Sequence, residues 1–547
     1  MTLHAIGPAI VFTFLFVMVS CNQPETDVSE QRPNIIFIMS DDHAYQAISA
    51  YGSNLIQTPN IDRIATEGML FRNACVSNSI CAPSRATILT GKHSHINGKV
   101  DNVMPFDTSQ VTFPQLFQQA GYQTAMYGKL HFGNNPKGVD DFMILPGQGN
   151  YINPDFVTPE GDTTIVGYVT DIITDLTLNW LEEKRDKEKP FMLMYLHKAP
   201  HRPWWPRPDK FEEFLSKEFP EPPSLFDDYS NRGSAAKSAT MSVLHDMMYN
   251  HDSKIRPEVT ANMPDLNPAV PEYPGGFENP YTNRINDEQR ARYDPILDKI
   301  NSQFQEKWPV MNMEEKMRWK YQRYMQDYLA CISSVDDNVG RVLDYLDANE
   351  LATNTLVVYT SDQGFYLGEH GWFDKRFIYD ESFKTPLLMR WPQIIKPGST
   401  NDEMVQNLDF AQTLLAAAQI DAPADMQGES LMPLLTGDTD NWNRDAVYYH
   451  YYEYPAVHTV KRHYGIVTKE FKLAHFYYDV DEWELYDRLK DPQEMKNVFN
   501  DPDYTDTVNA LRVKLEEVRK KYGDSDKLNN QYIQIHLDNE IDTPLGK

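Results

Sequence analysis

Two short acidic segments each follow a run of apolar residues that is typical of a buried strand. The pair Asp41-Asp42 follows residues 34–39, and the pair Asp362-Gln363 follows residues 355–360. Either pair alone is typical of a turn or a helix N-cap. However, ligands of open α/β sheets bind at the carboxyl ends of strands, and adjacent carboxylates repel unless a cation lies between them. Carboxylate and amide oxygens are the ligands that Ca²⁺ and Mg²⁺ prefer, so the two pairs together favour a shared metal site.

A third feature is the segment Cys81-Ala82-Pro83-Ser84-Arg85, which leads to Thr90-Gly91. Pro83 suits the first turn of a helix because its missing N–H is not needed there, and Gly91 can end that helix. Cys81 is therefore expected at a helix N-terminus, where backbone donors and the helix dipole favour an anion. Arg85 follows one turn later. A lone cysteine is often a small buried hydrophobic residue, but these neighbours favour a reactive site.

The overall composition excludes several classes of protein. The chain has 547 residues, with 79 acidic and 51 basic side chains and a net charge of −28. A nucleic-acid-binding protein or a polybasic membrane-binding patch would need a basic excess. Because 41% of the residues are hydrophobic, the chain can bury a large core, and its four cysteines are too few for a disulfide scaffold.

Residues 1–20 are expected to be a signal peptide, because the apolar run 9–19 is too short to span a bilayer comfortably. The small Ser20 before Cys21 is similar to a bacterial lipoprotein signal, in which Cys21 is acylated after cleavage. A plain signal peptide with an incidental cysteine is the alternative. Either reading predicts an exported protein of a Gram-negative bacterium, in the periplasm or anchored to the outer membrane.

The elements that must position these residues alternate along the chain. Apolar strands are expected at 34–39, 123–127, 191–196, 355–360 and 386–390, with helices at 171–183, 315–349 and 407–419. This alternation predicts an α/β sheet with helices on both faces. The Pro-rich stretch 202–312 has little periodicity, and we expect an ordered insertion over the active face, with partial disorder as the alternative.

The pattern changes near the C-terminal end. Aromatic strand-like runs at 447–452, 464–468, 471–478 and 483–486 precede a charged helix at 506–522. We therefore expect a main domain at residues 32–440 and a C-terminal subdomain at 441–547, made of a small antiparallel sheet and a helix.

The cysteine segment resembles the signature of the type I sulfatases, whose motif cysteine is oxidised after translation to formylglycine by a formylglycine-generating enzyme. Three further segments resemble motifs of this family and follow in its order within residues 34–391: Gly128-Lys129-Leu130-His131, His197-Lys198-Ala199-Pro200-His201 and Gly368-Glu369-His370-Gly371-Trp372-Phe373-Asp374-Lys375-Arg376. The resemblance implies an alkaline-phosphatase-like fold, in which a mixed, mostly parallel sheet is flanked by helices and joined by a smaller C-terminal antiparallel sheet plus helix.

The resemblance also implies a metal site and a nucleophile. Ca²⁺, rather than Mg²⁺, would be bound by modified residue 81 together with Asp41, Asp42, Asp362 and Gln363. Gln363 departs from the family, where Asn or His is more usual, although its amide oxygen can still bind a cation. One hydroxyl of the hydrated aldehyde at Cys81 would attack the sulfate ester, and the other would later expel sulfate.

Charged side chains take the remaining roles that the resemblance implies. Arg85 would orient the hydrate, and Asp362 would accept the proton of the attacking hydroxyl. Lys129 and Lys375 would neutralise the sulfuryl group. His201 would protonate the leaving alcohol, and His131 would assist the release of sulfate.

The segments 363–376 and 452–465 are similar to those of bacterial N-acetylglucosamine-6-O-sulfatases. The expected substrate is therefore a sulfated carbohydrate, the 6-O-sulfate of N-acetylglucosamine in glycosaminoglycan or mucin glycans. His458, Arg462 and His463 are candidate sugar contacts, with surface or interdomain packing as the alternative. Other readings are a 2-O-uronate or choline sulfatase, a formylglycine-dependent phosphonate or phosphodiester hydrolase, and a non-catalytic glycan-binding protein. No nucleic acid is expected as a partner, and the membrane only through the lipid anchor.

Overall fold

The computed structural model describes residues 1–2, 32–263, 266, 284–440 and 442–538. Cys21 and residues 3–20 of the predicted signal peptide lie outside the described residues, as do residues 264–265 and 267–283 of the stretch 202–312. Within the described ranges, no helix combines the length and the apolar character that a membrane span requires.

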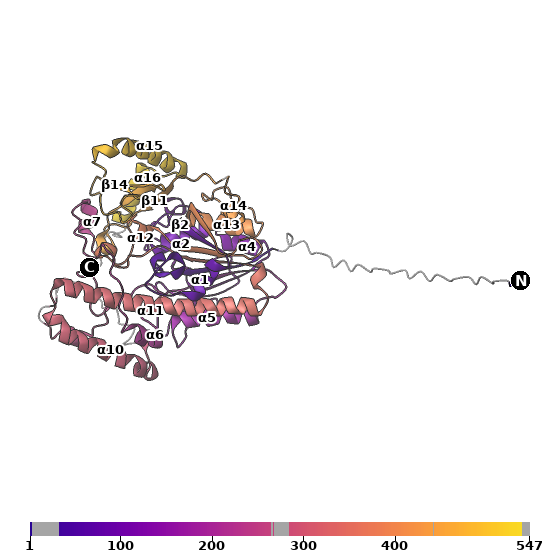
Figure 1. Ribbon diagram of the computed structural model, residues 1–547, viewed down its shortest axis with the longest axis horizontal. Coiled ribbons are helices and arrows are strands. Elements are labelled where there is room, and N and C mark those ends of the chain that lie inside the picture. The colour runs from indigo at the N-terminus through magenta and orange to yellow at the C-terminus, as the bar shows by residue number, and fades with distance from the viewer. Residues whose placement is uncertain (3–31, 264–265, 267–283, 441, 539–547) are drawn as a thin grey trace.

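A ten-stranded mixed sheet forms the centre of the molecule (Figure 1). Its strands are ordered β10-β2-β9-β8-β1-β7-β3-β4-β5-β6. The pairs from β8 to β4 are parallel, whereas β9, β5 and β6 pair antiparallel with their neighbours. The bounds are β1 (Asn34–Ser40), β2 (Met69–Cys75), β3 (Gln123–Lys129), β4 (Asp141–Leu145), β5 (Asp155–Thr158), β6 (Gly161–Thr164), β7 (Phe191–Leu196), β8 (Thr355–Ser361), β9 (Leu387–Arg390) and β10 (Ser399–Gln406).

The central strand β1 shows why its sequence is apolar without interruption. Successive side chains of a strand point to opposite faces. Ile36 and Ile38 accordingly pack into the core on one face of the sheet, and Ile35 and Phe37 pack into the core on the other. Because both faces are covered, an alternating polar pattern is absent from β1, as expected for a buried parallel strand.

Helices cover both faces of the main sheet. On one face lie α1 (Pro59–Thr66), α5 (Val169–Asn179) and α11 (Met313–Ala348), and α5 and α11 run side by side (Figure 1). The helix predicted at 315–349 is continuous. The other face holds α2 (Cys81–Thr90), α4 (Phe113–Gln119), α13 (Phe410–Ala417) and α14 (Met432–Thr436). Shorter helices are α3 (Ser94–Asn97) and α12 (Asp380–Phe383).

The described part of the stretch 202–312 contains four α-helices, of which α7 packs against the C-terminal sheet and the other three join the core that includes α11. They are α6 (Pro208–Phe214), α7 (Ser234–Ser238), α8 (Pro257–Thr260) and α10 (Asp287–Lys307). Asn286 caps α10 by accepting a hydrogen bond from the Gln289 backbone at 2.9 Å. The first three helices have only seven, five and four residues, which accounts for the weak periodicity there, whereas the 21-residue helix α10 was missed.

A second sheet, antiparallel and four-stranded, follows in the order β11-β12-β13-β14. The strands are β11 (Val447–Tyr451), β12 (His463–Val467), β13 (Phe471–Phe476) and β14 (Glu482–Asp487), and the helices α15 (Thr505–Tyr522) and α16 (Asp526–Asp538) follow them. Leu515 of α15 packs on Leu473 and Leu485 of the sheet. The predicted fold class is confirmed, with α16 as an additional helix. The boundary expected at residue 440 stays a prediction.

Candidate active site

The pairs Asp41-Asp42 and Asp362-Gln363 meet at one edge of the main sheet. Strands β1 and β8 are parallel neighbours, and Ser40 lies opposite Ser361, so the residues that follow them are brought together. Ligand oxygens of Asp41, Asp42 and Asp362 all lie within 4.8 Å of one another. The Asp42 backbone N–H also donates to Asp362 Oδ1 at 3.1 Å. The side chains are fully buried.

Gln363 completes this acidic cluster. Its Nε2 donates to the Asp42 carboxylate and lies 3.8 Å from Cys81 Sγ. Its Oε1 is buried and has no hydrogen-bond partner. Three carboxylates with an unpartnered amide oxygen form the hard-oxygen donor set that a divalent cation requires, so the residues present fit such an ion.

The pKa values of the three carboxylates differ, because each meets a different balance of burial and neighbouring charge. Burial, with repulsion from neighbouring carboxylates, raises the pKa of Asp42 to about 7 and that of Asp362 to about 6, against attraction from Lys375 and Arg85. Asp41 differs: burial opposes its ionisation, but nearby cations, above all Lys129, hold its pKa well below the usual value. Burial therefore disfavours the ionised forms of Asp42 and Asp362, and a cation at the cluster would favour those forms.

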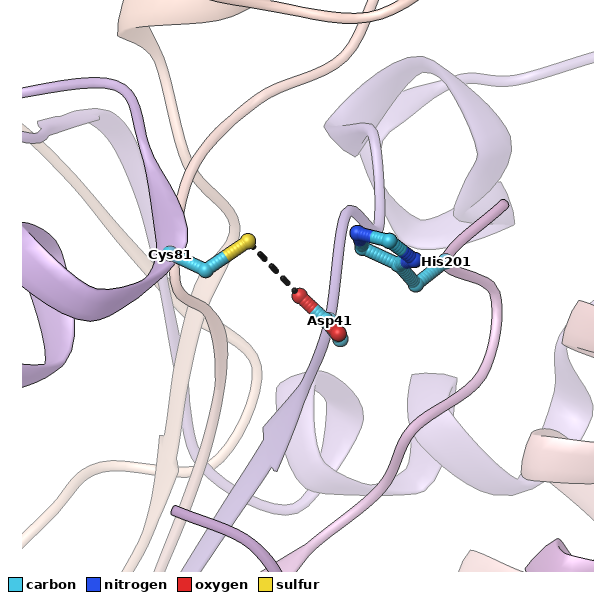
Figure 2. A group of neighbouring side chains, drawn as sticks. All are labelled: Asp41, Cys81 and His201. Carbon is cyan, nitrogen blue, oxygen red and sulfur yellow. Dashed lines mark hydrogen bonds between the residues drawn. The ribbon is translucent and has the colours of Figure 1, made fainter. Parts of the chain in front are cut away.

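Cys81 lies at the first position of α2, as predicted, and its Sγ is 3.3 Å from Asp41 Oδ1 (Figure 2). The side chain is completely buried. Burial, together with the Asp41 charge, raises the pKa of the thiol well above its usual value. Since the thiolate is the reactive form of cysteine, the encoded side chain is a poor nucleophile in this place.

Arg85 reaches back from the second turn of α2 to the acidic cluster. Its Nε and one terminal nitrogen each lie 2.9 Å from Asp362 Oδ2, and a terminal nitrogen lies 3.6 Å from Asp41 Oδ1. The guanidinium also donates to the Lys129 carbonyl. Arg85 thus links the helix that carries Cys81 to the ends of β8 and β3.

Two lysines face the cluster from other elements. Lys129, at the end of β3, contacts the Asp41 carboxylate and the amide oxygen of Gln148. Lys375 Nζ lies 2.8 Å from Asp42 Oδ2. Both lysines are buried. Gln148 had no signal in the sequence, because it lies in an ordinary Gly-rich loop.

Two histidines complete the group. His201 Nε2 lies 3.7 Å from Asp42 Oδ2, and Figure 2 shows its ring beside Asp41. With 13% of its side chain exposed, His201 lies at the more open end of the site. His131 follows Lys129 by two residues, and its buried Nδ1 has no hydrogen-bond partner. Burial, with the charge of Lys129, lowers the pKa of both histidines well below the usual value.

The three predicted sugar contacts lie in different environments. His458 Nε2 is 3.3 Å from Asp374 Oδ2, directly before Lys375, so it lies beside the site. Arg462 is buried, where it donates to Tyr454 O at 2.8 Å and to His536 Nδ1 at 2.7 Å. His463 is also buried, and its Nε2 accepts from the Ile378 backbone at 3.1 Å. The contacts of Arg462 and His463 favour the packing alternative. Asp374 was missed, although it stands inside a matched segment.

Known proteins resemble this chain both in sequence and in structure. A family model described as "Sulfatase" matches residues 33–420, and one described as "N-sulphoglucosamine sulphohydrolase, C-terminal" matches residues 368–521. The chain is 48% identical over 521 residues to N-acetylglucosamine-6-O-sulfatase of Bacteroides thetaiotaomicron, which covers 93% of this chain and 90% of the relative.

Solved structures are similar over nearly the whole chain. BT4656, in complex with its substrate D-glucosamine-2-N,6-O-disulfate, has a TM-score of 0.85 and 48% identity, covering 91% of this chain and 99% of that chain. A phosphonate monoester hydrolase from Silicibacter pomeroyi, at 20% identity and a TM-score of 0.61, covers 90% of this chain and 96% of that chain and shares the fold. Members of the sulfatase family generally use formylglycine and a divalent metal ion. The chain therefore belongs to the sulfatase family and is a sulfuric ester hydrolase.

Proposed function

We propose that the chain removes the 6-O-sulfate of N-acetylglucosamine in glycosaminoglycan or mucin glycans. The observation that carries this proposal is the 48% identity, over 93% of the chain, to a relative that is named for this activity. The substrate bound to BT4656 is a glucosamine sulfated at O6 and at the nitrogen. The 6-O-sulfate is therefore the group that both comparisons have in common.

The depth of the site supports a sulfate on a primary hydroxyl. The side chains that surround the acidic cluster are buried, with Arg85 1% and Lys375 3% exposed, and His201 is more open at 13%. A 6-O-sulfate extends from the sugar ring on a carbon of its own and can enter such a narrow site. We infer action at a chain end or on a protruding group.

Asp41, Asp42, Asp362 and Gln363 would hold Ca²⁺ in this proposal. The cation would supply charge that polarises sulfuryl oxygens and lowers the pKa of a neighbouring hydroxyl. Formylglycine, made from Cys81 by a formylglycine-generating enzyme, would supply a nucleophilic hydroxyl in place of the thiol. The flexible coordination of Ca²⁺ suits a site in which Gln replaces the more usual Asn or His.

Lys129 and Lys375 would hold the sulfuryl oxygens. Each ammonium group carries three donors, so each can keep its contact with a carboxylate and still donate to the substrate. Fixed donors around the transferred group stabilise the charge that develops on it. Arg85 would keep the Cys81 helix aligned with Asp362.

Proton transfer falls to three side chains. His201 would protonate the leaving alcohol; burial lowers the pKa of its ring well below the usual value, and a bound sulfate beside the ring would raise it. Asp362, whose pKa burial raises to about 6, would accept the proton of the attacking hydroxyl. His131 would assist the release of sulfate.

The proposal includes export and a lipid anchor at Cys21, which would place the enzyme in the periplasm or on the outer membrane. The acidic net charge of −28 gives no attraction to a sulfated glycan. Local cations, Lys129, Lys375 and Arg85, would provide that attraction inside the site. Replacing Cys21 by Ser should release the mature protein from the membrane fraction.

A substrate screen tests the proposal. Purified protein from a host that forms formylglycine is given glucosamine 6-O-sulfates with N-acetyl or N-sulfate groups, with 2-O-, 3-O- and 4-O-sulfated sugars as controls. Release of sulfate from the 6-O-sulfated sugars alone is expected. Preference for 2-O-uronate or choline sulfate, or for matched phosphate and phosphonate esters, would contradict the proposed substrate.

A further inference from the structure

The two residues after His201 are held by buried charges from the stretch 202–312. Arg202 donates two parallel hydrogen bonds to Asp252, Nε to Oδ1 and a terminal nitrogen to Oδ2, both at 2.6 Å. The Asp252 side chain is 1% exposed and that of Arg202 is 11% exposed. Asp252 Oδ2 also accepts from the Met248 backbone at 2.7 Å, so the turn that carries it is fixed.

Lys254 adds a second attachment from the same turn. Its Nζ donates to the Pro203 carbonyl at 3.2 Å and to Asp327 Oδ2 at 2.6 Å. Asp327 lies on α11 and accepts from Arg323 at 2.6 Å through its other oxygen. The turn 248–254 is therefore anchored on the long helix that covers the sheet, and it holds residues 202 and 203 from that fixed position.

These contacts determine the position of the His201 ring. His201 Nδ1 lies 2.6 Å from the Arg202 carbonyl oxygen, so the Arg202 backbone holds the ring edge opposite Nε2. Tyr151 Oη donates to the His201 carbonyl at 2.6 Å. The contacts at Nδ1 and at the His201 carbonyl thus leave Nε2 facing Asp42 at the acidic cluster. The Arg202 guanidinium also lies over the Phe373 ring, at 5.1 Å, two residues before Lys375.

Stability alone does not account for this arrangement. Burying an ion pair costs desolvation energy that often exceeds the attraction gained, and apolar residues of similar size can serve as well. Two such pairs, Arg202–Asp252 and Lys254–Asp327, converge on the residues next to His201. Bidentate pairing restricts both distance and orientation. A proton donor depends on such restricted geometry, whereas the stability of the fold does not require it.

We infer that Arg202 and Asp252 are positioning residues that fix the His201 imidazole for proton donation to the leaving alcohol. The inference rests on the proposed role of His201. It assigns to the stretch 202–312 a task in the reaction, because Asp252 reaches the site from fifty residues beyond Arg202 in the sequence.

The test is the dependence of turnover on the leaving group. A series of aryl sulfates of rising phenol pKa, together with the sugar sulfate, is hydrolysed by the formylglycine-containing wild type, Asp252→Asn, Arg202→Lys and His201→Ala. An acid contributes about 10²- to 10⁴-fold for poor leaving groups, and misplacing it by about 1 Å costs up to about 100-fold. Asp252→Asn and Arg202→Lys should therefore lose about 10- to 100-fold on the sugar sulfate and less than about 2-fold on the most activated aryl sulfate.

A double variant, Asp252→Asn with His201→Ala, distinguishes a positioning role from a general loss of activity. Asp252→Asn alone should make turnover depend more steeply on the phenol pKa. Added to His201→Ala, it should not change that dependence further. Equal losses for every leaving group would overturn the inference. If His201→Ala itself fails to steepen the dependence, the proposed acid role fails instead.

A matched control removes the effect of destabilisation. Arg444 and Asp409 form another buried bidentate pair, with side chains 5% and 0% exposed, that makes no contact with residues 201–203 among the interactions described. Asp409→Asn should lower the melting temperature by a similar amount and keep the wild-type leaving-group dependence. A steepened dependence in this control would also count against the inference.

Discussion

The Lys375 ammonium lies 2.8 Å from Asp42 Oδ2, while the Lys129 ammonium contacts the adjacent Asp41. Each lysine is therefore bound to a different carboxylate of the acidic cluster. Because these carboxylates also form the candidate metal site, a bound cation and the two lysines share the same anionic groups. Metal binding and recognition of the sulfuryl group are consequently expected to be coupled.

Removal of divalent cations should inactivate the protein and weaken its affinity for inorganic sulfate. The reason is that Asp41, Asp42 and Asp362, freed of the cation, would repel an anion at the same place. Activity is measured after dialysis against a chelator and again after addition of Ca²⁺ or Mg²⁺. Restoration by Ca²⁺ at lower concentration than Mg²⁺ is expected.

The melting temperature provides a test of Ca²⁺ binding at the acidic cluster that does not depend on activity. A ligand that binds only the folded state at about 100 times its Kd stabilises it by about 2.7 kcal/mol, so Ca²⁺ should raise the melting temperature. Asp42→Asn should abolish that rise. Activity that survives chelation, together with a melting temperature indifferent to Ca²⁺, would exclude the proposed metal site.

Cys81→Ser should abolish turnover in a host that converts only cysteine to formylglycine. Serine fits the same buried position and keeps a donor toward Asp41, 3.3 Å from the thiol, so folding should be retained. Activity with a sugar sulfate and the mass of the peptide containing residue 81 are measured. Full activity of Cys81→Ser, or an unmodified thiol in fully active wild type, would contradict the assignment.

The centre of the fold and the acidic cluster could be predicted because local and global signals agree there. Strands buried on both faces, such as β1 and β8, have an unbroken apolar centre, and acidic residues stand just beyond their carboxyl ends. Strand neighbours then place Asp41 beside Asp362, although the two are far apart in the chain. Pro83 and Gly91 likewise mark the helix that presents Cys81.

Edge strands and long-range contacts could not be predicted. β10 begins with polar residues, and its pairing with β2 shifts register between Asn401 and Met404, so it shows neither alternation nor an apolar run. Asp252 and Gln148 lie in loops without periodicity, and only the tertiary fold brings them to Arg202 and Lys129. The buried state of Arg462 depends on α16, a helix that was not expected.

Arg462 and His458 should behave differently when replaced. Arg462→Ala removes the hydrogen bonds to His536 Nδ1 and to the Tyr454 carbonyl, which costs about 1–3 kcal/mol, while the KM for the sugar sulfate stays within about 2-fold. His458→Ala should raise that KM, because the ring lies 3.3 Å from Asp374, next to Lys375. Melting temperature and KM are measured for both variants. A raised KM in Arg462→Ala at unchanged stability would restore Arg462 as a sugar contact.

His370 should make the stability of the fold depend on pH. Burial and the charge of Arg232 disfavour its charged form, but the carboxylates of Asp227, 3.2 Å from Nδ1, and Glu381, 3.7 Å from Nε2, outweigh them and raise its pKa above the usual 6.5. A histidine with a raised folded-state pKa contributes stability that is complete below about pH 6.5 and is lost as the pH rises through the folded-state value. The difference in unfolding free energy between wild type and His370→Gln should therefore be largest at acidic pH and shrink toward alkaline pH, by at most about 1.4 kcal/mol per pH unit. Denaturant unfolding at several pH values measures this, with His245→Gln as the control, since His245 is exposed and outside that ion-pair group. A difference that is constant with pH would mean that folding does not shift the pKa of His370, and a difference that grows toward alkaline pH would mean that folding lowers it.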